Sequence, residues 1–421
     1  MTIVESLPRP SPSRIALRVT PDAQRRIRAG HPWLYDGSIR SASRDGAPGD
    51  LAVVFDDDRR FVAVGLWDPA SPIRLKVLHQ GKPVQIDETW FRAALQRSFD
   101  VRRPLAETAG TADATTAYRL VHGENDGLPG LVLDRYGDVV VVKLYTAAWI
   151  PHLPVLVPLI EGMVGAASVV LRVSRALQEQ PLHGLSEGDT IAGDRVDEPM
   201  VFQEHGLMFE ADVVRGQKTG HFLDQRDNRA RIRDLSRGAR VLDVFSCTGG
   251  FSVHAAAGGA TAVHSVDTSP FAIAAARRNM ERNADNRDVR ACSHDATTGD
   301  AFAVMEQLAR DRRRFDVVVI DPPSFAQNAA SVDRALTSYA RLTTLGLSLV
   351  ERGGVLFQAS CSSRVGEPDF ARTVHRAAAV AGYDLDELAR TGHPLDHPVH
   401  PDTFPEGRYL KAIVARPRRS R

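Results

Sequence analysis

The stretch RVLDVFSCTGGFSVHAAAGGATAVHSVD, residues 240–267, decides the fold of the second half of the chain. Its two apolar runs each carry an aspartate at or near the end, and a glycine pair followed by an alanine-rich segment lies between them. A strand, a glycine turn, a helix and a second strand in this order form a βαβ unit with parallel strands. We therefore expect an α/β sheet whose ligands bind beyond the carboxyl ends of its strands.

The alternation of strand and helix extends outward from this unit. A hairpin is predicted at 201–214 and a short helix at 227–238. Beyond residue 267, helices are predicted at 270–283, 300–312, 330–351 and 367–381. The strands between them are VRACSHD (289–295), FDVVVIDPP (315–323) and GVLFQAS (354–360). This series predicts a doubly wound, mainly parallel sheet.

The first half of the chain has a different pattern. Four short apolar runs, at 14–19, 51–57, 61–67 and 73–78, are separated by the turn segments RDGAPGD and DPASP, which is typical of a small β-barrel. A helix at 88–103, a loop at 104–116 and two strands around the YGD turn at 136–138 follow. A chain of 421 residues is too long for one core. We predict three domains: 13–92, 93–200 and 201–421.

Composition excludes several classes of protein. With 43% hydrophobic and 25% charged residues the chain is typical of globular domains, and we see no run near the ~18 uncharged apolar residues of a membrane span. The N-terminus has no apolar signal segment. Three scattered cysteines form neither a disulfide framework nor a zinc site, so we expect a cytoplasmic protein without a metal.

Charge is nearly balanced over the whole chain but uneven along it. The formal net charge is +1, which excludes a strongly basic nucleic-acid binder. Residues 1–103 nevertheless hold 17 Lys and Arg against 12 Asp and Glu, and the C-terminal RPRRSR adds four arginines. This mild basic surface is compatible with RNA contact or with an ordinary solvated face.

Acidic side chains stand at the ends of four predicted strands. Asp243 precedes the glycine turn, where the helix start at Gly249 and Gly250 presents backbone N–H groups to an anion. Asp267 ends the second strand, where an acid binds a ribose diol; it or Ser269 also suits a helix N-cap. Asp295 ends the predicted third strand. The fourth leads into DPPSF (321–325), in which two prolines fix Asp321 beside Phe325, as a pocket for a planar base requires.

The segment FQASCSSRV, 357–365, places one of the three cysteines where a predicted strand turns polar. A cysteine inside an apolar run is usually a small hydrophobe, whereas an attacking thiol needs an exposed strand end. We interpret Cys361 as a nucleophile, and Cys247 and Cys292 as packing residues. Either Arg364 or the position at the strand end is proposed to lower the pKa of Cys361.

Histidines outside these loops are given structural or gating roles. His393, His397 and His400 lie among prolines that exclude a helical metal site, so we interpret their segment as a loop closing over a cleft. His31 is predicted to be structural, with Trp33 in the barrel core.

Longer motifs resemble those of a known family. They are AGHPWLYDGSI, DPASPIRLKVL, ENDGLPGLVLDRYGD, GQKTGHFLDQRDNR (216–229), DVFSCTGGF, VDTS, DPPSF, SCSS, DHPV and PEGRYLKA (405–412). Together they resemble class I S-adenosylmethionine-dependent methyltransferases. More narrowly, they resemble the bacterial large-subunit ribosomal RNA cytosine-C5 methyltransferases with an N-terminal PUA domain. The resemblance implies a Rossmann-like catalytic domain, a PUA-like β-barrel that binds RNA and a small α+β central domain.

The resemblance also implies roles for individual residues. Cys361 would be the nucleophile and Asp321 would contact the target cytosine. Asp267 would hold the ribose of S-adenosylmethionine and Asp295 would face its adenine. The full set assigned to the cofactor is Gln225, Arg226, Asp243, Phe245, Ser246, Gly249, Gly250, Asp267, Thr268, Ser269, Asp295, Ala296 and Asp321. The partner would be ribosomal RNA, 23S in bacteria, and a homodimer is left open.

Chemistry supports the thiol and the carboxylate independently. Cytosine C5 is a poor nucleophile until a thiolate adds at C6. A carboxylate near N3 stabilises the protonated ring. The base that removes the C5 proton is not identified by the sequence.

Alternatives to this reaction remain open. A relative of the same fold could methylate guanine N7, where no thiol is needed, and an adenine-N6 enzyme would leave Cys361 idle. A non-catalytic RNA-binding or assembly factor would not bind the cofactor.

Overall fold

The computed structural model describes residues 3–326 and 328–420, which form two compact units. Unit 1 holds the chain up to Gln203 together with Ala211–Leu223 and Leu395–Gly407. Unit 2 holds Glu204–Glu210, Asp224–Pro394 and the chain from Arg408 onward. The segments 211–223 and 395–407, which the sequence assigned to the catalytic domain, thus belong to unit 1. The three-domain division itself stays a prediction.

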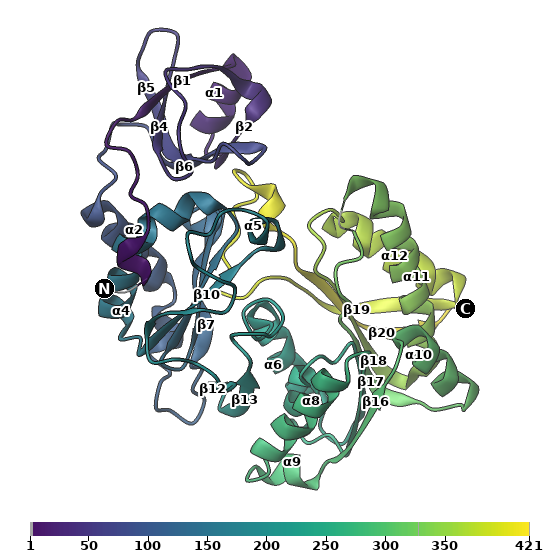
Figure 1. The fold of residues 1–421 in the computed structure, drawn as a ribbon. Helices are drawn as coiled ribbons and strands as arrows, with labels where there is room; N and C mark the ends of the chain where they lie inside the picture. Colours follow the sequence, from purple (N-terminus) through teal and green to yellow (C-terminus); the bar gives the residue numbers. More distant parts are fainter. Residues whose placement is uncertain (1–2, 327, 421) are drawn as a thin grey trace. The chain divides into compact units, whose positions relative to one another are not determined.

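The N-terminal part of unit 1 is a curved six-stranded sheet (Figure 1). Its strands, in spatial order, are β2 (Trp33–Tyr35), β6 (Ile73–Gln80), β5 (Phe61–Trp67), β4 (Leu51–Phe55), β1 (Ile15–Val19) and β3 (Ile39–Ala42). The four predicted apolar runs are confirmed as β1, β4, β5 and β6. The sequence analysis missed α1 (Pro21–Arg28), although its signal was present: Thr20 caps the helix by accepting the Ala23 N–H, and Pro21 begins it.

A second sheet of five strands fills the rest of unit 1. Its order is β11 (Thr190–Gly193), β10 (Ser168–Val173), β9 (Val139–Leu144), β8 (Leu131–Tyr136) and β7 (Ala117–His122). The helices are α2 (Glu88–Val101), α3 (Arg103–Ala106), α4 (Leu153–Val164) and α5 (Arg175–Gln178). The YGD hairpin is confirmed, whereas α3 replaces the start of the predicted loop at 104–116. Val64 and Leu66 of β5 join Leu131 and Trp149 in one core, so the first two predicted domains pack together.

One segment of unit 1 corrects the hydropathy analysis. Ala147–Val164 is long and apolar enough to cross a membrane by length and composition, which we did not expect. In the structure it forms a short 3-10 helix and α4, and 61% of it is buried. Its apolar side chains pack into the core of unit 1, as those of a core helix do.

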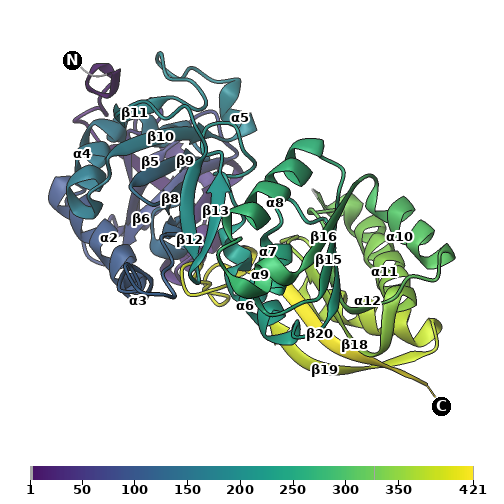
Figure 2. The same ribbon diagram turned by 90° about the horizontal axis from the view of Figure 1, so that it is seen from below.

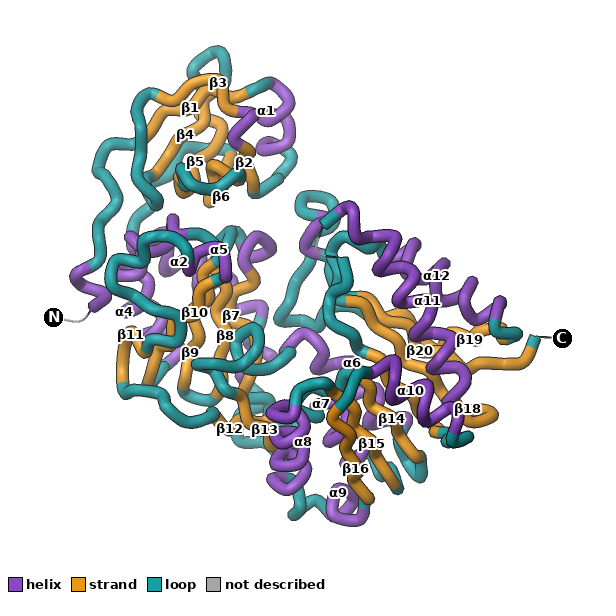
Figure 3. Tube along the Cα trace, turned by 45° about the vertical axis from the view of Figure 1, so that its right-hand side comes forward, coloured by secondary structure: helices purple, strands orange, loops and turns teal. Residues whose placement is uncertain are grey.

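Unit 2 is built on a seven-stranded sheet with helices on both faces (Figures 2 and 3). The order is β16 (Ser293–Thr298), β15 (Ala262–Asp267), β14 (Arg240–Val244), β17 (Phe315–Ile320), β18 (Val350–Ser360), β20 (Lys411–Arg419) and β19 (Tyr383–Thr391). The first five strands are parallel, and β20 runs antiparallel to both its neighbours. The predicted doubly wound, mainly parallel sheet is confirmed.

The helices of unit 2 form two groups (Figure 2). One face of the sheet carries α6 (Arg226–Leu235), α7 (Gly250–Ala257) and α8 (Pro270–Arg282). The other carries α10 (Ala301–Arg310), α11 (Val332–Leu349) and α12 (Glu367–Val380). The predicted hairpin is formed by β12 (Met200–Glu204) and β13 (Leu207–Ala211).

The predicted third strand, VRACSHD, was wrong in its first half. Residues Arg287–Ala291 form α9, because the Asn286 side chain accepts the N–H groups of Asp288 and Val289 and so begins a helix there. Cys292 ends this helix, so it is not inside a strand as predicted. The strand starts at Ser293, directly after Cys292, and extends past Asp295 to Thr298.

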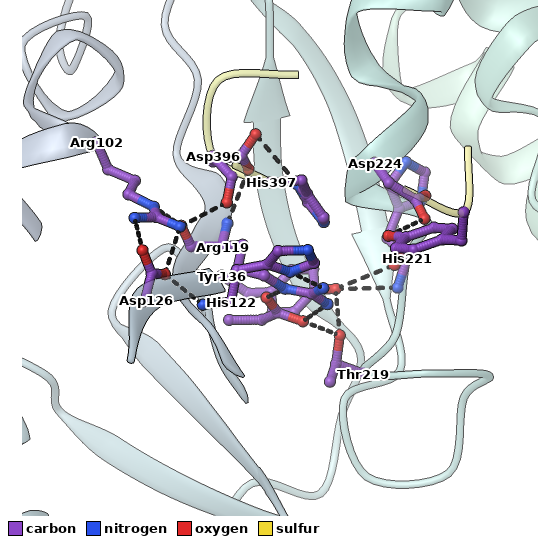
Figure 4. A network of polar contacts seen from close by, with 12 residues as sticks. Arg102, Arg119, His122, Asp126, Tyr136, Thr219, His221, Asp224, Asp396 and His397 are labelled. Carbon is purple, nitrogen blue, oxygen red and sulfur yellow. Dashed lines mark hydrogen bonds and ion pairs between the residues drawn. The ribbon is translucent and has the colours of Figure 1, made fainter. Parts of the chain in front are cut away.

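Hydrogen bonds bind the two later segments of unit 1 to the rest of that unit (Figure 4). Arg102 bonds Asp126 with both guanidinium nitrogens, at 2.9 and 2.7 Å, and donates to the Asp396 carbonyl at 2.8 Å. From the other segment, Thr219 donates to Asp134 at 2.6 Å. The motif GQKTGHFLDQRDNR is therefore divided: residues 216–223 belong to unit 1, and 224–229 belong to unit 2.

Within the described residues, 3–326 and 328–420, no cluster of His, Cys, Asp or Glu could hold a metal.

The structure also places the histidines outside the strand loops, together with Trp33. His400 bonds the Asn125 carbonyl at 3.0 Å, within unit 1, and the predicted closing of its loop stays a prediction. His31 is buried. Trp33, however, is not in the barrel core: it is half-buried and donates to Glu124 at 2.9 Å.

Candidate active site at the carboxyl edge of the sheet

Strand register brings the predicted loops of unit 2 to one edge. Val244 pairs with Val266 on one side and with Ile320 on the other, and Ile320 pairs with Gln358. The loops that follow β15, β14, β17 and β18 therefore leave the same end of four adjacent strands. This is where the sequence analysis placed the site.

The loop after β14 has a strained backbone. Phe245, Cys247 and Gly249 have φ angles of 65°, 48° and 77°, in the left-handed region that non-glycine residues rarely adopt. The Gly249 N–H donates to the Ser246 carbonyl at 2.8 Å, and Asn279 donates to the Thr248 carbonyl at 2.9 Å. A Cβ at Gly249 would lie 2.8 Å from Ala276, so only glycine fits between this turn and α8.

Asp243 lies beneath this turn and is fully buried. Its Oδ2 accepts the Ser252 hydroxyl at 2.6 Å, and burial raises the pKa of the carboxyl to about 7. Ser252 in turn bonds Ser265 of β15 at 2.7 Å. Asp243 thus connects β14 to α7 and supports the turn from below.

Asp267 joins the two neighbouring loops. Its Oδ2 accepts the Cys247 N–H at 3.0 Å and its Oδ1 accepts the Ser269 N–H at 2.9 Å. Ser269 caps α8 by accepting the Ala272 N–H. Ser269 is therefore the residue that caps the helix, and the ribose-binding role of Asp267 stays a prediction. Thr268, between them, is exposed.

The acid at the end of the third strand is not the predicted one. Asp295 is the third residue of β16, is exposed, and accepts the N–H of its neighbour Ala296 at 2.9 Å. Asp300 follows the strand instead, where it caps α10, and the preceding Gly299 donates to the Asp267 carbonyl at 2.9 Å. Asp300 therefore lies beyond the strand end, where we expected Asp295, and it comes five residues later in the segment SHDATTGD.

The residues around the β14 loop fit S-adenosylmethionine. The Ser246 hydroxyl is buried and has no partner, which leaves it for a ligand. Burial raises the pKa of the Cys247 thiol to about 11, and the negative charges of Asp267, Asp321 and Asp243 add to the increase. A site with this negative field suits a sulfonium cation and the hydroxyl donors of a ribose. Gly250 begins α7, where a Cβ would lie 2.8 Å from Arg229, so this glycine is needed for packing.

A chain of amide hydrogen bonds holds Asp321. Gln225 donates to Asp321 Oδ1 at 2.7 Å, and Asn228 donates to Gln225 at 2.6 Å. Thr391 of β19 donates to Asn228 at 2.6 Å. Gln225 thus contacts the Asp321 turn, and its role in binding the cofactor stays a prediction. Arg226 is buried beside it and pairs with Asp227 at 3.3 Å.

Cys361 directly follows β18 and is partly buried. Its thiol donates to the Pro322 carbonyl at 3.7 Å, so the sulfur lies against the Asp321 turn. The flanking serines are buried: Ser360 donates to the Tyr339 hydroxyl at 2.8 Å and Ser362 to the Ala326 carbonyl at 3.3 Å. The serines hold the loop in place while the sulfur remains at the sheet edge.

The charge beside Cys361 comes from a residue that the sequence analysis overlooked. Lys411, at the start of β20, pairs across the sheet with Ser360. It is buried, and burial lowers the pKa of its ammonium to about 8, against the opposing influence of Cys361 and Glu367. Arg364, which the sequence analysis proposed for this role, is exposed.

Phe325 is only partly available as a base-stacking surface. Its ring is half-buried and packs against Tyr339 with the centroids 5.3 Å apart. Tyr339, another residue that the sequence analysis missed, is buried and belongs to a core cluster that also holds Ala326 and Val365, on either side of the Cys361 loop. Only the PEGRYLKA motif signalled Lys411, whereas no motif contains Tyr339.

Comparison with known proteins agrees with this geometry. A family described as S-adenosylmethionine-dependent methyltransferase matches residues 118–414, and a PUA-like domain family matches residues 17–80. A ribosomal RNA large subunit methyltransferase of Deinococcus radiodurans is 43% identical over 409 residues, 97% of this chain and 98% of that protein. A ribosomal RNA large subunit methyltransferase I of Shewanella denitrificans is 33% identical over 96% of this chain and 99% of that protein.

Two solved structures share the fold. A SAM-dependent methyltransferase from Streptococcus mutans has a TM-score of 0.78 at 23% identity and covers 95% of this chain and 99% of that chain. A methyltransferase complexed with SAH has a TM-score of 0.80 at 23% identity, covering 96% and 99%. With the family matches, they confirm the predicted fold class, a Rossmann-like methyltransferase domain with an N-terminal PUA-like domain.

Proposed function

The chain belongs to the S-adenosylmethionine-dependent ribosomal RNA large-subunit methyltransferase family, and we propose that it forms 5-methylcytosine in 23S ribosomal RNA through a covalent bond from Cys361. S-adenosylmethionine is its cofactor. A ribosomal RNA substrate agrees with a cytoplasmic location. A homodimer stays a prediction.

One observation carries the choice of base. The Cys361 sulfur lies 3.7 Å from the Pro322 carbonyl, beside Asp321, at the strand edge that also bears the glycine turn. Guanine N7 already holds a nucleophilic lone pair, and an adenine-N6 methyltransferase would leave the thiol idle, so neither reaction needs Cys361. Cytosine C5 does need one, because adding a thiolate at C6 makes C5 an enamine carbon.

The residues of the site divide the reaction between them. As the thiolate adds at C6, N3 of the cytosine ring takes up a proton from water, and Asp321, held by Gln225, would accept a hydrogen bond from that N3–H. The N3 proton returns to water when the product forms. Cys361 would add to C6, and after C5 has been methylated the loss of the C5 proton allows the C6–S bond to break and the thiolate to leave. The target base must leave its stack to reach this edge.

Cofactor binding is assigned to the loops after β14, β15 and β16. Ser246 and the backbone of Phe245, Gly249 and Gly250 would hold the methionine end, Asp267 the ribose, and Asp300 the adenine in place of Asp295. When bound, S-adenosylmethionine supplies an electrophilic methyl group at this edge.

The test is a covalent trap on RNA. A ribosomal RNA transcript carrying 5-fluorocytosine should form a denaturant-stable complex with the wild-type protein, because fluorine at C5 cannot leave as a proton and the C6–S bond persists. The Cys361→Ser variant should form none. Bisulfite mapping should show one 5-methylcytosine in ribosomal RNA from cells that contain the protein, and this 5-methylcytosine should be missing from cells that lack it.

Two results would contradict this function. Methylation at guanine N7 or adenine N6, with activity surviving in Cys361→Ala, would establish an alternative reaction of the same fold. Absence of S-adenosylmethionine binding in calorimetry would leave a non-catalytic RNA-binding factor.

A further inference from the structure

Lys411 lies on β20 next to the candidate nucleophile. The antiparallel register pairs Lys411 with Ser360, the residue just before Cys361. Its Nζ donates to the Ser362 carbonyl, just after Cys361, and to the Tyr409 carbonyl at 3.0 Å. The backbone of Lys411 therefore pairs with the residue before Cys361, and its ammonium bonds the residue after Cys361.

A buried ammonium requires a nearby anion. Lys411 is 4% exposed, and its two hydrogen-bond acceptors are neutral carbonyls. Burying a cation without a counter-charge is costly. The carboxylate of Glu367 is near, but it pairs with Arg408 at 2.5 Å. Of the two groups whose negative charge favours the ammonium, Cys361 as a thiolate has a larger influence than Glu367.

We propose that Lys411 is the positioning residue that keeps Cys361 as a thiolate. This rests on the proposed function, in which Cys361 attacks cytosine C6. The positive charge of the Lys411 ammonium favours the charged form of the sulfur. The two backbone carbonyls hold the ammonium in place, so the sulfur does not have to hold it and remains able to attack. Lys411 thus takes the role that the sequence analysis gave to Arg364.

The other groups that face Cys361 make such a cation necessary. Asp321 is a carboxylate beside the same turn, and its negative charge opposes a thiolate. The Tyr339 hydroxyl stays neutral, because burial raises the pKa of its phenol. Lys411 is the cation on the opposite strand, and Arg408 is held by Glu367.

The experiment measures the rate of alkylation at each cysteine against pH, in the absence of RNA and cofactor. The full chain is treated with iodoacetamide, and labelled peptides are quantified by mass spectrometry. Cys361 should titrate clearly below the ~8.5 of a free thiol. Cys247 and Cys292, whose thiol pKa values are each raised to about 11 by burial, serve as internal references and should react slowly near pH 7.

Variants separate charge from packing. Lys411→Met should raise the apparent pKa of Cys361 by about one unit or more, which slows alkylation near pH 7 about tenfold. Lys411→Arg keeps the charge and should retain most of the rate. Arg364→Gln, at an exposed arginine, should leave it unchanged.

Contrary results are equally clear. A wild-type Cys361 that titrates at or above the free value overturns the proposal, even where Lys411→Met fails to fold. An unchanged profile in a folded Lys411→Met does so too. Because no RNA is present, a thiolate without cytosine methylation refutes the proposed function alone, whereas methylation with an ordinary thiol refutes the role of Lys411 alone.

Discussion

Two cysteines of unit 2 occupy loops at the same edge of one sheet but in opposite electrostatic surroundings. Cys247 lies in the loop after β14, where Asp267, Asp321 and Asp243 oppose its ionisation. Cys361 lies in the loop after β18, with its sulfur against Pro322 and the ammonium of Lys411 nearby. The residue type is identical, although Cys361 directly follows its strand and Cys247 lies three residues beyond the end of β14.

The difference teaches that local charge, more than residue type, distinguishes the loop that we assign to the cofactor from the loop that we assign to the nucleophile. A loop lined with carboxylates attracts the positive sulfonium and keeps a thiol protonated. A loop with a buried ammonium does the reverse. In the proposed function, the methyl donor and the attacking sulfur use these opposite environments at the same edge, on either side of β17.

Substituting each cysteine in turn should have the largest effect on this comparison. Cys361→Ala should lower methyl transfer to ribosomal RNA by ~10³-fold or more, because the nucleophile is lost. Cys247→Ala should stay within about fivefold of the wild type, as expected of a packing residue. Transfer of a radiolabelled methyl group measures both. Equal losses in the two variants would remove the distinction.

The pH dependence of the free energy of unfolding tests the buried carboxyl of Asp243, which supports the loop after β14. Burial raises the pKa of folded Asp243 to about 7, so the folded state holds a proton that the unfolded chain has lost. The stabilising contribution is fully present below the unfolded pKa of ~3.9 and falls as pH rises through about 7, by roughly 2–3 kcal/mol between about pH 5 and 8. Asp243→Asn should flatten this slope in urea unfolding.

The matched control for that experiment is an exposed acid. Asp295→Asn removes a carboxylate at the surface of β16 and should keep the wild-type slope. A wild-type slope in Asp243→Asn as well would mean that other groups carry the pH dependence.

The smallest expected effect concerns the charge of Asp267. After burial, the charge of Asp267 is the largest cause of the raised pKa of the Cys247 thiol. Asp267→Asn removes that charge, so the pKa of the thiol should fall from about 11. A change of about half a unit would speed its alkylation roughly threefold. Cys361 should react as before. If Cys247 does not respond, its low reactivity comes from burial alone.

Local pattern was sufficient for most of unit 2. The strands β14, β15 and β17 and the helices α7, α8 and α12 lie where the residues predicted them, because buried parallel strands are apolar runs and Ser269 with Pro270 is a strong helix start. The same local logic failed at 287–298. There a cap from Asn286 began a helix and moved the strand end from Asp295 to beyond Thr298.

The sequence by itself determined the βαβ order, the strand-end loops, the family and Cys361 as the candidate nucleophile, because periodicity, glycine turns and motifs are encoded locally. Only the tertiary structure decided which charge stands beside that sulfur. Lys411 lies fifty residues further along the chain, and antiparallel pairing of β20 with β18 brings it there, whereas Arg364, three residues away, projects into solvent. Electrostatic partners depend on distance in space, which sequence separation does not report.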